Sequence, residues 1–486
     1  MTTAGEQAEL SKIPGSSAQR SARANSPGVL DRTIFAALLA VVAFVAVPYG
    51  TVEPWWQALF ECAVFVLAAL WLIQGFLSGS HSFSPYRIFL PLVALAIFGI
   101  LQTISFANNG PPLTSGATVW HTLSADPHET RLWVSRMLAL VLVGAMLTRY
   151  TRSSSRLRAL IFLVIGIAVA SAVFGLLRKT MQHDLGFVLP YLRPGLGYGQ
   201  FINNNHFAFL MEMALGLTLG LCATGSVRRD RWPLYLSVAL LLGMSLVLST
   251  SRGGILTMLC QLIFIALLFP VVRSTRADHK PGSSVSKLAQ RVLGSLLLRA
   301  LLILSLIITV SVGIVWVGGD PLMARLEAIP GEVATREVNA RWGERRMEIW
   351  KATWQLIKAH PIAGVGMAGY WTAIPQYHDA SGEFTPQRAH NDYLELFASG
   401  GLIGLLLGVW FIVVFAKAVS RQLRTADSFR RAASFAALVG IAGVALHSFV
   451  DFGLHITVNA VLLIVLIVIA TVDLPATNLE TSVPSK

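Results

Sequence analysis

Long apolar stretches alternate with short polar segments along most of the chain. Each stretch holds roughly 18 to 25 mostly apolar residues, the length that an α-helix needs to cross the hydrocarbon core of a bilayer. We therefore expect an all-α, polytopic integral membrane protein with about twelve transmembrane helices. The predicted spans lie near residues 33–50, 55–76, 87–106, 132–148, 157–177, 205–223, 232–249, 253–271, 293–317, 397–416, 432–450 and 455–472.

The composition supports the same class of protein. Of the 486 residues, 54% are hydrophobic and only 13% are charged, which is unusual for a soluble domain of this length. A net charge of +13 would suggest a nucleic-acid partner for a soluble protein. In a membrane protein the excess of Lys and Arg in cytoplasmic loops explains this charge more simply, so we expect no nucleic acid. The three cysteines all lie in apolar stretches, and we expect neither disulfides nor a zinc site.

The basic connections between spans predict the orientation. Segments 149–158, 226–232, 273–291 and 417–431 are rich in Lys and Arg, whereas segment 106–130 contains neither. With twelve spans, the four basic segments fall on the same side as the N-terminus. Because Lys and Arg are enriched in cytoplasmic loops, we expect both termini in the cytoplasm.

The long segment 318–396 falls on the outer side, between spans 9 and 10. Within it, RRMEIWKATWQLIKAHP carries Trp350, Trp354 and other apolar residues at helical spacing, which predicts an amphipathic helix that ends near Pro361. The polar ends of the chain are expected to be disordered tails. The expected organisation is a cytoplasmic tail (1–30), transmembrane helices 1–9 (31–317), a large outer loop subdomain (318–396), transmembrane helices 10–12 (397–473) and a second tail (474–486).

Polar and charged residues gather on the outer side. Arginines there fit phosphate groups, because a guanidinium fork matches phosphate oxygens and keeps its charge at any working pH. A histidine can exchange a proton near neutral pH, and a neighbouring carboxylate can orient its ring. The candidates are His390 and Asp392 for catalysis, Arg252, Arg345, Arg346 and Arg388 for binding phosphate, and Asn205, His206, Glu212, His447 and Asp451 in supporting roles.

Each of these motifs also has a purely structural interpretation. NNNHFA (203–208) can be a helix N-cap, and SRGG (251–254) can be a tight turn with an arginine that reaches the membrane interface. His447 with Asp451 can form a hydrogen bond between helices, and His390 with Asp392 can be an ordinary pair beside the membrane.

Several familiar motifs are absent from the sequence. It contains no DxD, HExxH or C-x-x-C motif and no glycine-rich nucleotide loop followed by Lys-Ser/Thr. This argues against an ATP-driven pump and against an enzyme that uses a sugar nucleotide with a metal. We expect no cofactor and no metal. An enzyme on the outer face would need a donor that arrives already activated and attached to lipid.

The sequence resembles one family of membrane enzymes over residues 195–470. The resemblance rests on GQFINNNHFAFLME (199–212), STSRGG (249–254), ERRMEIWKATWQLIKAHPIAGVGMAGY (344–370), RAHNDYLELFASGGLIGLLL (388–407) and HSFVDFGLHITVNA (447–460). These segments are similar to those of the superfamily of O-antigen ligases and Wzy-type polysaccharide polymerases, which are bacterial membrane glycosyltransferases.

The resemblance implies a reaction at the periplasmic face of the inner membrane. Members of the superfamily move a glycan from undecaprenyl diphosphate to a hydroxyl of an acceptor sugar, in O-antigen or exopolysaccharide biosynthesis. The acceptor is lipid A–core in ligases and a lipid-linked glycan in polymerases, and these motifs do not distinguish the two. The resemblance makes His390 the essential histidine of the periplasmic loop and Arg252, Arg346 and Arg388 the cations for the diphosphate. The chain departs from the family in lacking an obvious second histidine motif in this loop.

The alternative is a membrane transporter or flippase of lipid-linked glycans, and a non-catalytic assembly partner is a third possibility. Twelve spans suit a transporter, but alternating access favours internal repeats and charged residues near the midplane of the membrane. In this sequence the charged residues gather on one side, beside a large loop, which favours the enzyme.

Overall fold

The computed structural model describes residues 28–78, 84–105, 121–274, 333–378 and 386–474, together with Leu304 and Ile308. Within these ranges the regular elements are helices, apart from two isolated bridges, Ser105–Thr122 and Phe187–Leu189. The predicted all-α class is therefore confirmed for the described residues. The longer helices are α2 (Val29–Phe44), α3 (Pro54–Ser78), α4 (Leu90–Gln102), α5 (Pro127–Tyr150), α6 (Ser154–Met181), α7 (Asn204–Ala223), α8 (Trp232–Leu248), α9 (Arg252–Ser274), α12 (Val333–Ala359), α14 (Asp392–Leu423), α15 (Ser428–His447) and α16 (Thr457–Thr471). The short ones are η1 (Ser84–Phe89), η2 (Arg229–Arg231), α13 (Tyr370–Ala373), η3 (Ile374–Gln376) and η4 (Gly453–His455).

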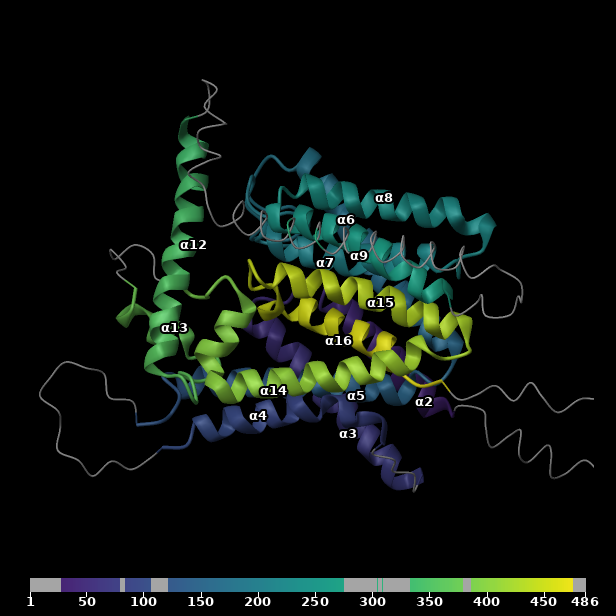
Figure 1. The fold of residues 1–486 in the computed structure, drawn as a ribbon, viewed down its shortest axis with the longest axis horizontal. Helices are drawn as coiled ribbons and strands as arrows, with labels where there is room; N and C mark the ends of the chain where they lie inside the picture. Colours follow the sequence, from purple (N-terminus) through teal and green to yellow (C-terminus); the bar gives the residue numbers. More distant parts are fainter. Residues whose placement is uncertain are drawn as a thin grey trace, which may run out of the picture.

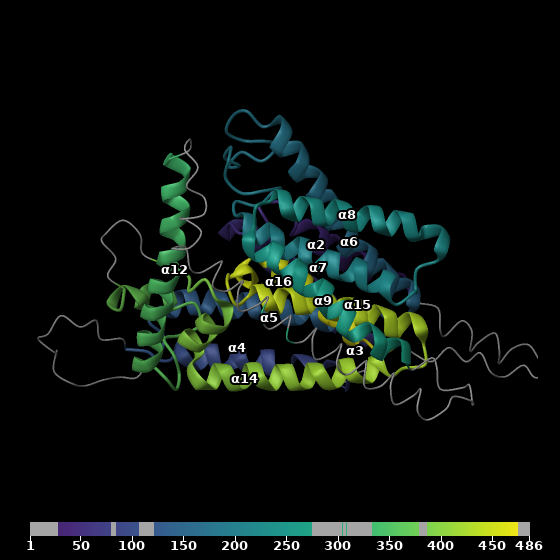
Figure 2. The ribbon, with the colours of Figure 1, turned by 45° about the horizontal axis from the view of Figure 1, so that its top comes forward.

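The long helices form one bundle, with α7 in its interior and α12 across one end (Figures 1 and 2). Helix α7 packs against α6, α8, α9 and α15, and most of its side chains are buried. Polar residues begin several of these helices. Asp126, Asn203, Asn391 and Asp427 each accept hydrogen bonds from backbone amides of the first turn of α5, α7, α14 and α15.

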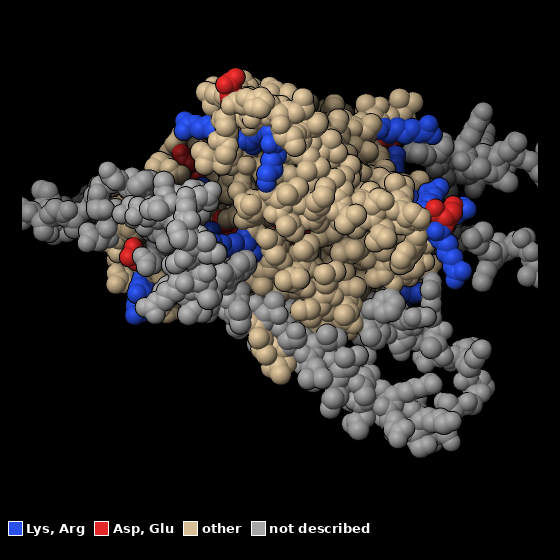
Figure 3. Space-filling model, turned by 90° about the horizontal axis from the view of Figure 1, so that it is seen from above, with Lys and Arg blue, Asp and Glu red and all other residues tan. Residues whose placement is uncertain are grey.

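The helices agree with the predicted spans where both can be compared. A helix overlaps each predicted span except 293–317, of which the structure describes only Leu304 and Ile308. Seven described helices are long and apolar enough to cross a membrane, and three apolar helices are shorter. On the face shown in Figure 3, Lys and Arg gather at both ends of the bundle, with an uncharged band between them. The chain is thus a polytopic membrane protein, and the number of spans stays a prediction.

The segment 318–396, which is predicted to be an outer loop subdomain, is described in part. Helix α12 covers the segment for which the sequence predicts an amphipathic helix, and it ends at Ala359, two residues before Pro361. It begins earlier than the predicted segment, at Val333. Figure 1 shows α12 crossing the end of the bundle at which α14 begins.

A break in α14 fixes the position of its first turns. Gly401 has a φ of 59°, and a Cβ at this position would lie 2.3 Å from the Ile362 carbonyl oxygen. At Gly364, where φ is 68°, a Cβ would lie 2.4 Å from the carbonyl carbon of Ser399. Glycine is therefore required on both sides of this contact. Backbone hydrogen bonds of 2.8 to 3.2 Å join 361–366 to 398–403 and satisfy the groups that the break leaves open. The motif P-x-x-G-x-G at residues 361–366 thus holds residues 392–400 in place.

Candidate active site

The candidate residues lie at one end of the bundle, where α7, α9 and α14 begin and α15 ends. Asp451 lies in the turn between α15 and η4, and its side chain is 1% exposed. Its Oδ1 lies 3.6 Å from Nδ1 of His390, and its Oδ2 lies 3.6 Å from Nη2 of Arg346. Asn205 donates a side-chain hydrogen bond to Oδ2, and the Phe452 amide donates one of 2.8 Å to Oδ1. One buried carboxylate therefore joins α7, α12 and the segment before α14.

The electrostatics keep this carboxylate ionised. Burial alone would raise the pKa of Asp451, but the neighbouring His390 and the positive charge of Arg346 hold it well below its usual range. The side chains of His390 and Arg346 are 22% and 16% exposed, so they remain reachable above the buried carboxylate. Since Nδ1 of His390 faces Asp451, Nε2 is the nitrogen left to exchange a proton with a ligand.

The turn that carries His390 is held from three directions. His390 has a φ of 50°, a left-handed conformation that costs a residue other than glycine about 1–3 kcal/mol. The Trp350 indole donates a 3.0 Å hydrogen bond to the Ala389 carbonyl oxygen, and the Ala389 amide donates one of 2.9 Å to Glu395 Oε2. The Asn391 side chain caps α14 and donates to the Phe449 carbonyl. Trp350 of α12 therefore contacts this turn directly, whereas Arg346, four residues earlier on the same helix, contacts Asp451, which faces His390.

A second cluster lies on the first turn of α14. Glu395 Oε1 is 2.9 Å from Arg388 Nη1 and 3.0 Å from His455 Nε2. Asp392 does not face His390. Its Oδ1 is 3.2 Å from His455 Nδ1, and its Oδ2 accepts a 2.7 Å hydrogen bond from Ser448. Burial and Arg388 would lower the pKa of His455, but Glu395 and Asp392 raise it to about 8.

A cavity of about 230 Å³ lies beside this second cluster. Asp392, Glu395 and His455 line it, together with Arg136 of α5. Apolar residues of α4, α5 and α14, among them Leu95, Trp133, Met137 and Leu396, form much of the remaining wall. The predicted arginines Arg252, Arg346 and Arg388 are not among its lining residues.

A comparison with protein families matches a segment that contains part of this site. Residues 237–409 match a family model described as O-antigen ligase. Residues 237–409 carry an O-antigen ligase domain. The comparison with curated proteins gave no match. Over these 173 of its 486 residues the chain is similar to a family of membrane ligases and polymerases of the glycosyltransferase type.

The O-antigen ligase domain contains only part of the cluster. It includes Arg346, His390 and Glu395, but Asn205, Asp451 and His455 lie outside it. The carboxylate that His390 faces thus comes from the turn after α15, and the imidazole that Glu395 contacts comes from η4.

Two helices from outside the O-antigen ligase domain also meet the SRGG turn. His447 Nδ1 lies 2.6 Å from Glu212 Oε1, and both side chains are buried. A Cβ at Gly253 would lie 2.4 Å from His447 Nε2, so only glycine fits there. The Ser251 hydroxyl donates a 2.8 Å hydrogen bond to Asn205. The side-chain partner of His447 is therefore Glu212, whereas the sequence suggested Asp451.

The NNNHFA motif (203–208) has both a structural role and a contact with the candidate site. Asn203 caps α7, as the structural interpretation predicts, while Asn205 reaches Asp451. His206 is 7% exposed, and its ring centroid lies 4.9 Å from that of Phe452, which also contacts His390 at 4.7 Å.

Two of the predicted phosphate-binding arginines, Arg252 and Arg345, remain to be placed. Arg252 begins α9 at the same end of the bundle. Arg345 lies on α12, but its side chain is outside the described part of the structure. Sequence reasoning missed Arg136 as a site residue. Its Nε lies 3.8 Å from Glu61 Oε1, and Ser135 donates a 2.5 Å hydrogen bond to Glu61 Oε2. The available signal was an arginine inside a predicted span, which usually faces the interior of a bundle.

Proposed function

We propose that this chain transfers a glycan from undecaprenyl diphosphate to a hydroxyl of an acceptor sugar at the periplasmic face of the bacterial inner membrane. The observation that carries the proposal is the contact of reachable His390 and Arg346 with one buried carboxylate, Asp451. A base and a cation held together suit a reaction in which a hydroxyl loses a proton while a diphosphate leaves.

In the proposed reaction the acceptor oxygen attacks the anomeric carbon of the donor glycan. The bond from this carbon to the diphosphate oxygen breaks, and its electron pair stays with undecaprenyl diphosphate. The proton of the acceptor hydroxyl passes to Nε2 of His390, while Asp451 orients the ring through Nδ1. The distance of 3.6 Å exceeds that of a hydrogen bond, and such contacts often shorten when substrate binds.

Arginines take the place of a metal ion in this proposal. Arg346 and Arg388 are held by buried carboxylates, so their positions are set before the negative charge develops on the leaving group. Arg252 and Arg345 remain candidates for the same diphosphate. We add Arg136, because it lines a cavity whose other walls are mostly apolar and suit the polyprenyl part of the donor.

Asp392 takes a different role from the one that the sequence suggested. It faces His455 and Ser448, and we assign it to positioning His455 against Glu395 and Arg388. The orientation of His390 falls to Asp451.

The experiment is a transfer assay with purified protein in detergent. The donor is an undecaprenyl-diphosphate-linked glycan, and the acceptors are lipid A–core and a second lipid-linked glycan, with products followed by gel mobility. A new covalent product with lipid A–core identifies a ligase, and one with the lipid-linked glycan identifies a polymerase. EDTA is expected to leave the rate unchanged. Movement of intact donor across vesicles, without any new covalent product, would contradict the proposal and support a flippase.

A further inference from the structure

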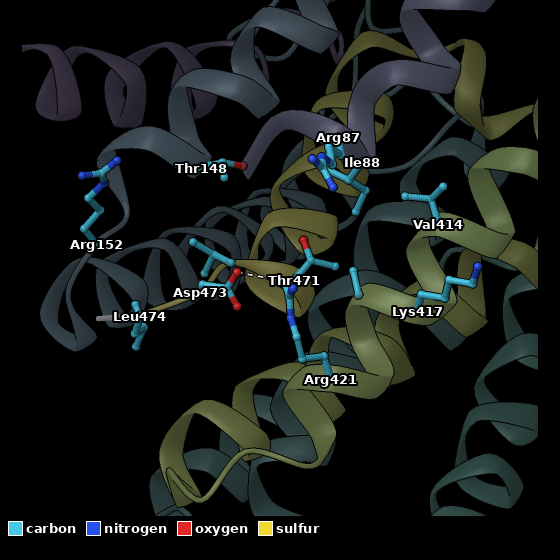
Figure 4. A pocket seen from close by; sticks show the side chains of 12 residues that line it. Arg87, Ile88, Thr148, Arg152, Val414, Lys417, Arg421, Thr471, Asp473 and Leu474 are labelled. Carbon is cyan, nitrogen blue, oxygen red and sulfur yellow. Dashed lines mark hydrogen bonds and ion pairs between the residues drawn. The ribbon is translucent and has the colours of Figure 1, made fainter. Parts of the chain in front are cut away.

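A larger cavity lies at the end of the bundle opposite the candidate active site. It has a volume of about 640 Å³ and lies between η1, the end of α5, the last turns of α14 and the end of α16 (Figure 4). Four cationic side chains surround it with a single carboxylate. They are Arg87, Arg152, Lys417 and Arg421, with Asp473.

The carboxylate does not balance the cations. Asp473 Oδ2 lies 2.8 Å from Arg421 Nη2, and Gln422 donates to its other oxygen. Among the described residues, no carboxylate lies within ion-pair distance of Arg87, Arg152 or Lys417. The lining therefore carries an excess of positive charge.

Further positive charge lies just outside the cavity. Arg430 is 2% exposed, and its Nε donates a 2.8 Å hydrogen bond to the carbonyl oxygen of Val472, a lining residue. Its two terminal nitrogens have no hydrogen-bond partner among the described residues. Burial and the neighbouring Arg149 lower the pKa of Arg152. An anion in the cavity would stabilise the charged form of Arg152 and so counter this lowering of its pKa.

The rim of the cavity connects it to the surface that faces lipid. Val414 and Ala418 of α14 line the cavity, and the same helix exposes Leu406, Val409 and Val413 in the turns before them. In a membrane protein such an exposed apolar surface contacts acyl chains. The cations thus lie where this surface ends, at the level of the lipid headgroups.

We infer that this cavity binds the phosphodiester headgroup of an anionic phospholipid, in the membrane leaflet opposite the candidate active site. The guanidinium groups of Arg87 and Arg152 suit phosphate oxygens, and Lys417 adds a point charge beside them. The apolar residues of the rim contact the glycerol and the first acyl carbons. Free phosphate shares the same chemistry but does not use this rim. The inference is independent of the proposed glycan transfer.

The test uses the full chain, purified and stripped of lipid in a non-ionic detergent. Phosphatidylglycerol, phosphatidylcholine and inorganic phosphate are added separately, and bound lipid is measured by native mass spectrometry alongside the melting temperature. Phosphatidylglycerol is expected to bind and to raise the melting temperature, while the other two have little effect. If inorganic phosphate stabilises the protein as much as phosphatidylglycerol does, the lipid assignment is wrong.

A double variant locates the site. Arg87→Gln with Lys417→Gln is expected to weaken phosphatidylglycerol binding about tenfold or more, because it removes two of the cations that surround the cavity. The matched control is Arg229→Gln with Arg231→Gln, which changes two exposed arginines at the same end of the bundle but outside the cavity. The melting temperature without lipid checks that each variant is folded. Equal affinity in the double variant and the wild type, or equal losses in the two double variants, would overturn the inference.

Discussion

Nδ1 of His390 lies 3.6 Å from the buried carboxylate of Asp451, although the two residues belong to different polar segments of the chain. Asp392, which is two residues from His390 in the sequence, faces His455 instead. Sequence proximity therefore does not identify the carboxylate that acts on this histidine. Several measurements can separate the two acids and test the rest of the site.

His390→Ala is expected to lower glycan transfer about 10²–10⁴-fold, because general base catalysis typically contributes that factor. Binding of the lipid-linked donor should persist, since arginines hold the diphosphate. The measurement is the rate of product formation together with donor retention. His128→Ala, which changes an exposed histidine at the start of α5, serves as the control. Transfer at the wild-type rate in His390→Ala would remove this imidazole from the mechanism.

Asp451→Asn is expected to lower kcat by more than Asp392→Asn does, because only Asp451 faces His390. Both variants keep the size of the side chain, so melting temperatures should be compared first to separate folding from catalysis. Steady-state kinetics with saturating donor then gives the comparison. A larger loss of kcat in Asp392→Asn would mean that Asp392, and not Asp451, orients the ring of His390.

Arg346→Lys is expected to lower kcat/KM about tenfold or more although the charge is kept, because lysine lacks the planar fork that matches two phosphate oxygens. The measurement is the initial rate as a function of donor concentration. Arg193→Lys, at an exposed arginine before α7, is the matched control and should behave as the wild type. If lysine at position 346 supports normal turnover, a simple positive charge is sufficient there.

The thermal stability should depend on pH through His455. Its folded-state pKa is raised to about 8 from an ordinary value of 6.5. The protonated ring therefore stabilises the fold fully below about pH 6.5, and this stabilisation is lost as the pH rises through about 8. The loss is on the order of 1–2 kcal/mol. Melting temperatures between pH 6 and pH 9 should fall less steeply in His455→Gln than in the wild type, and parallel curves would contradict this expectation.

Gly401→Ala is expected to destabilise the protein by about 2 kcal/mol or more, because the new Cβ meets the Ile362 carbonyl at 2.3 Å in a backbone conformation that favours glycine. Gly408→Ala, in the straight part of the same helix, meets no atom closer than 3.4 Å and should be nearly neutral or slightly stabilising. Melting temperatures and yields of folded protein compare the two. Similar effects at both positions would mean that the break does not depend on glycine.

The sequence predicts most of the helices, because each apolar stretch must form its own hydrogen bonds within a membrane. It also identifies the polar segments that meet at one end of the bundle. It does not predict the pairing among them, since Asp451 joins Asn205, Arg346 and His390 only after helices distant in sequence have packed. Arg136 was missed for a related reason. The arginine is visible inside a predicted span, but the cavity that it lines exists only between packed helices.

The P-x-x-G-x-G motif is easy to recognise in the sequence, but its structural role is visible only in the folded chain. Backbone amides and carbonyls of two glycine-containing segments, 361–366 and 398–403, form hydrogen bonds with each other. A pattern of apolar positions treats α14 as continuous after position 397, and only the backbone conformation of Gly401 reveals the break.

The distribution of the site over the chain bears on attempts to divide it. A polypeptide made only of residues 237–409 would contain His390, Arg346 and Arg388, but its histidine would face no buried acid, because Asp451 is encoded further on. Such a fragment should be inert even where it inserts into a bilayer. A different division should keep the activity. If the full chain is cut within 424–427, between α14 and α15, and the two parts are co-expressed, glycan transfer should be restored, provided that the parts reassemble.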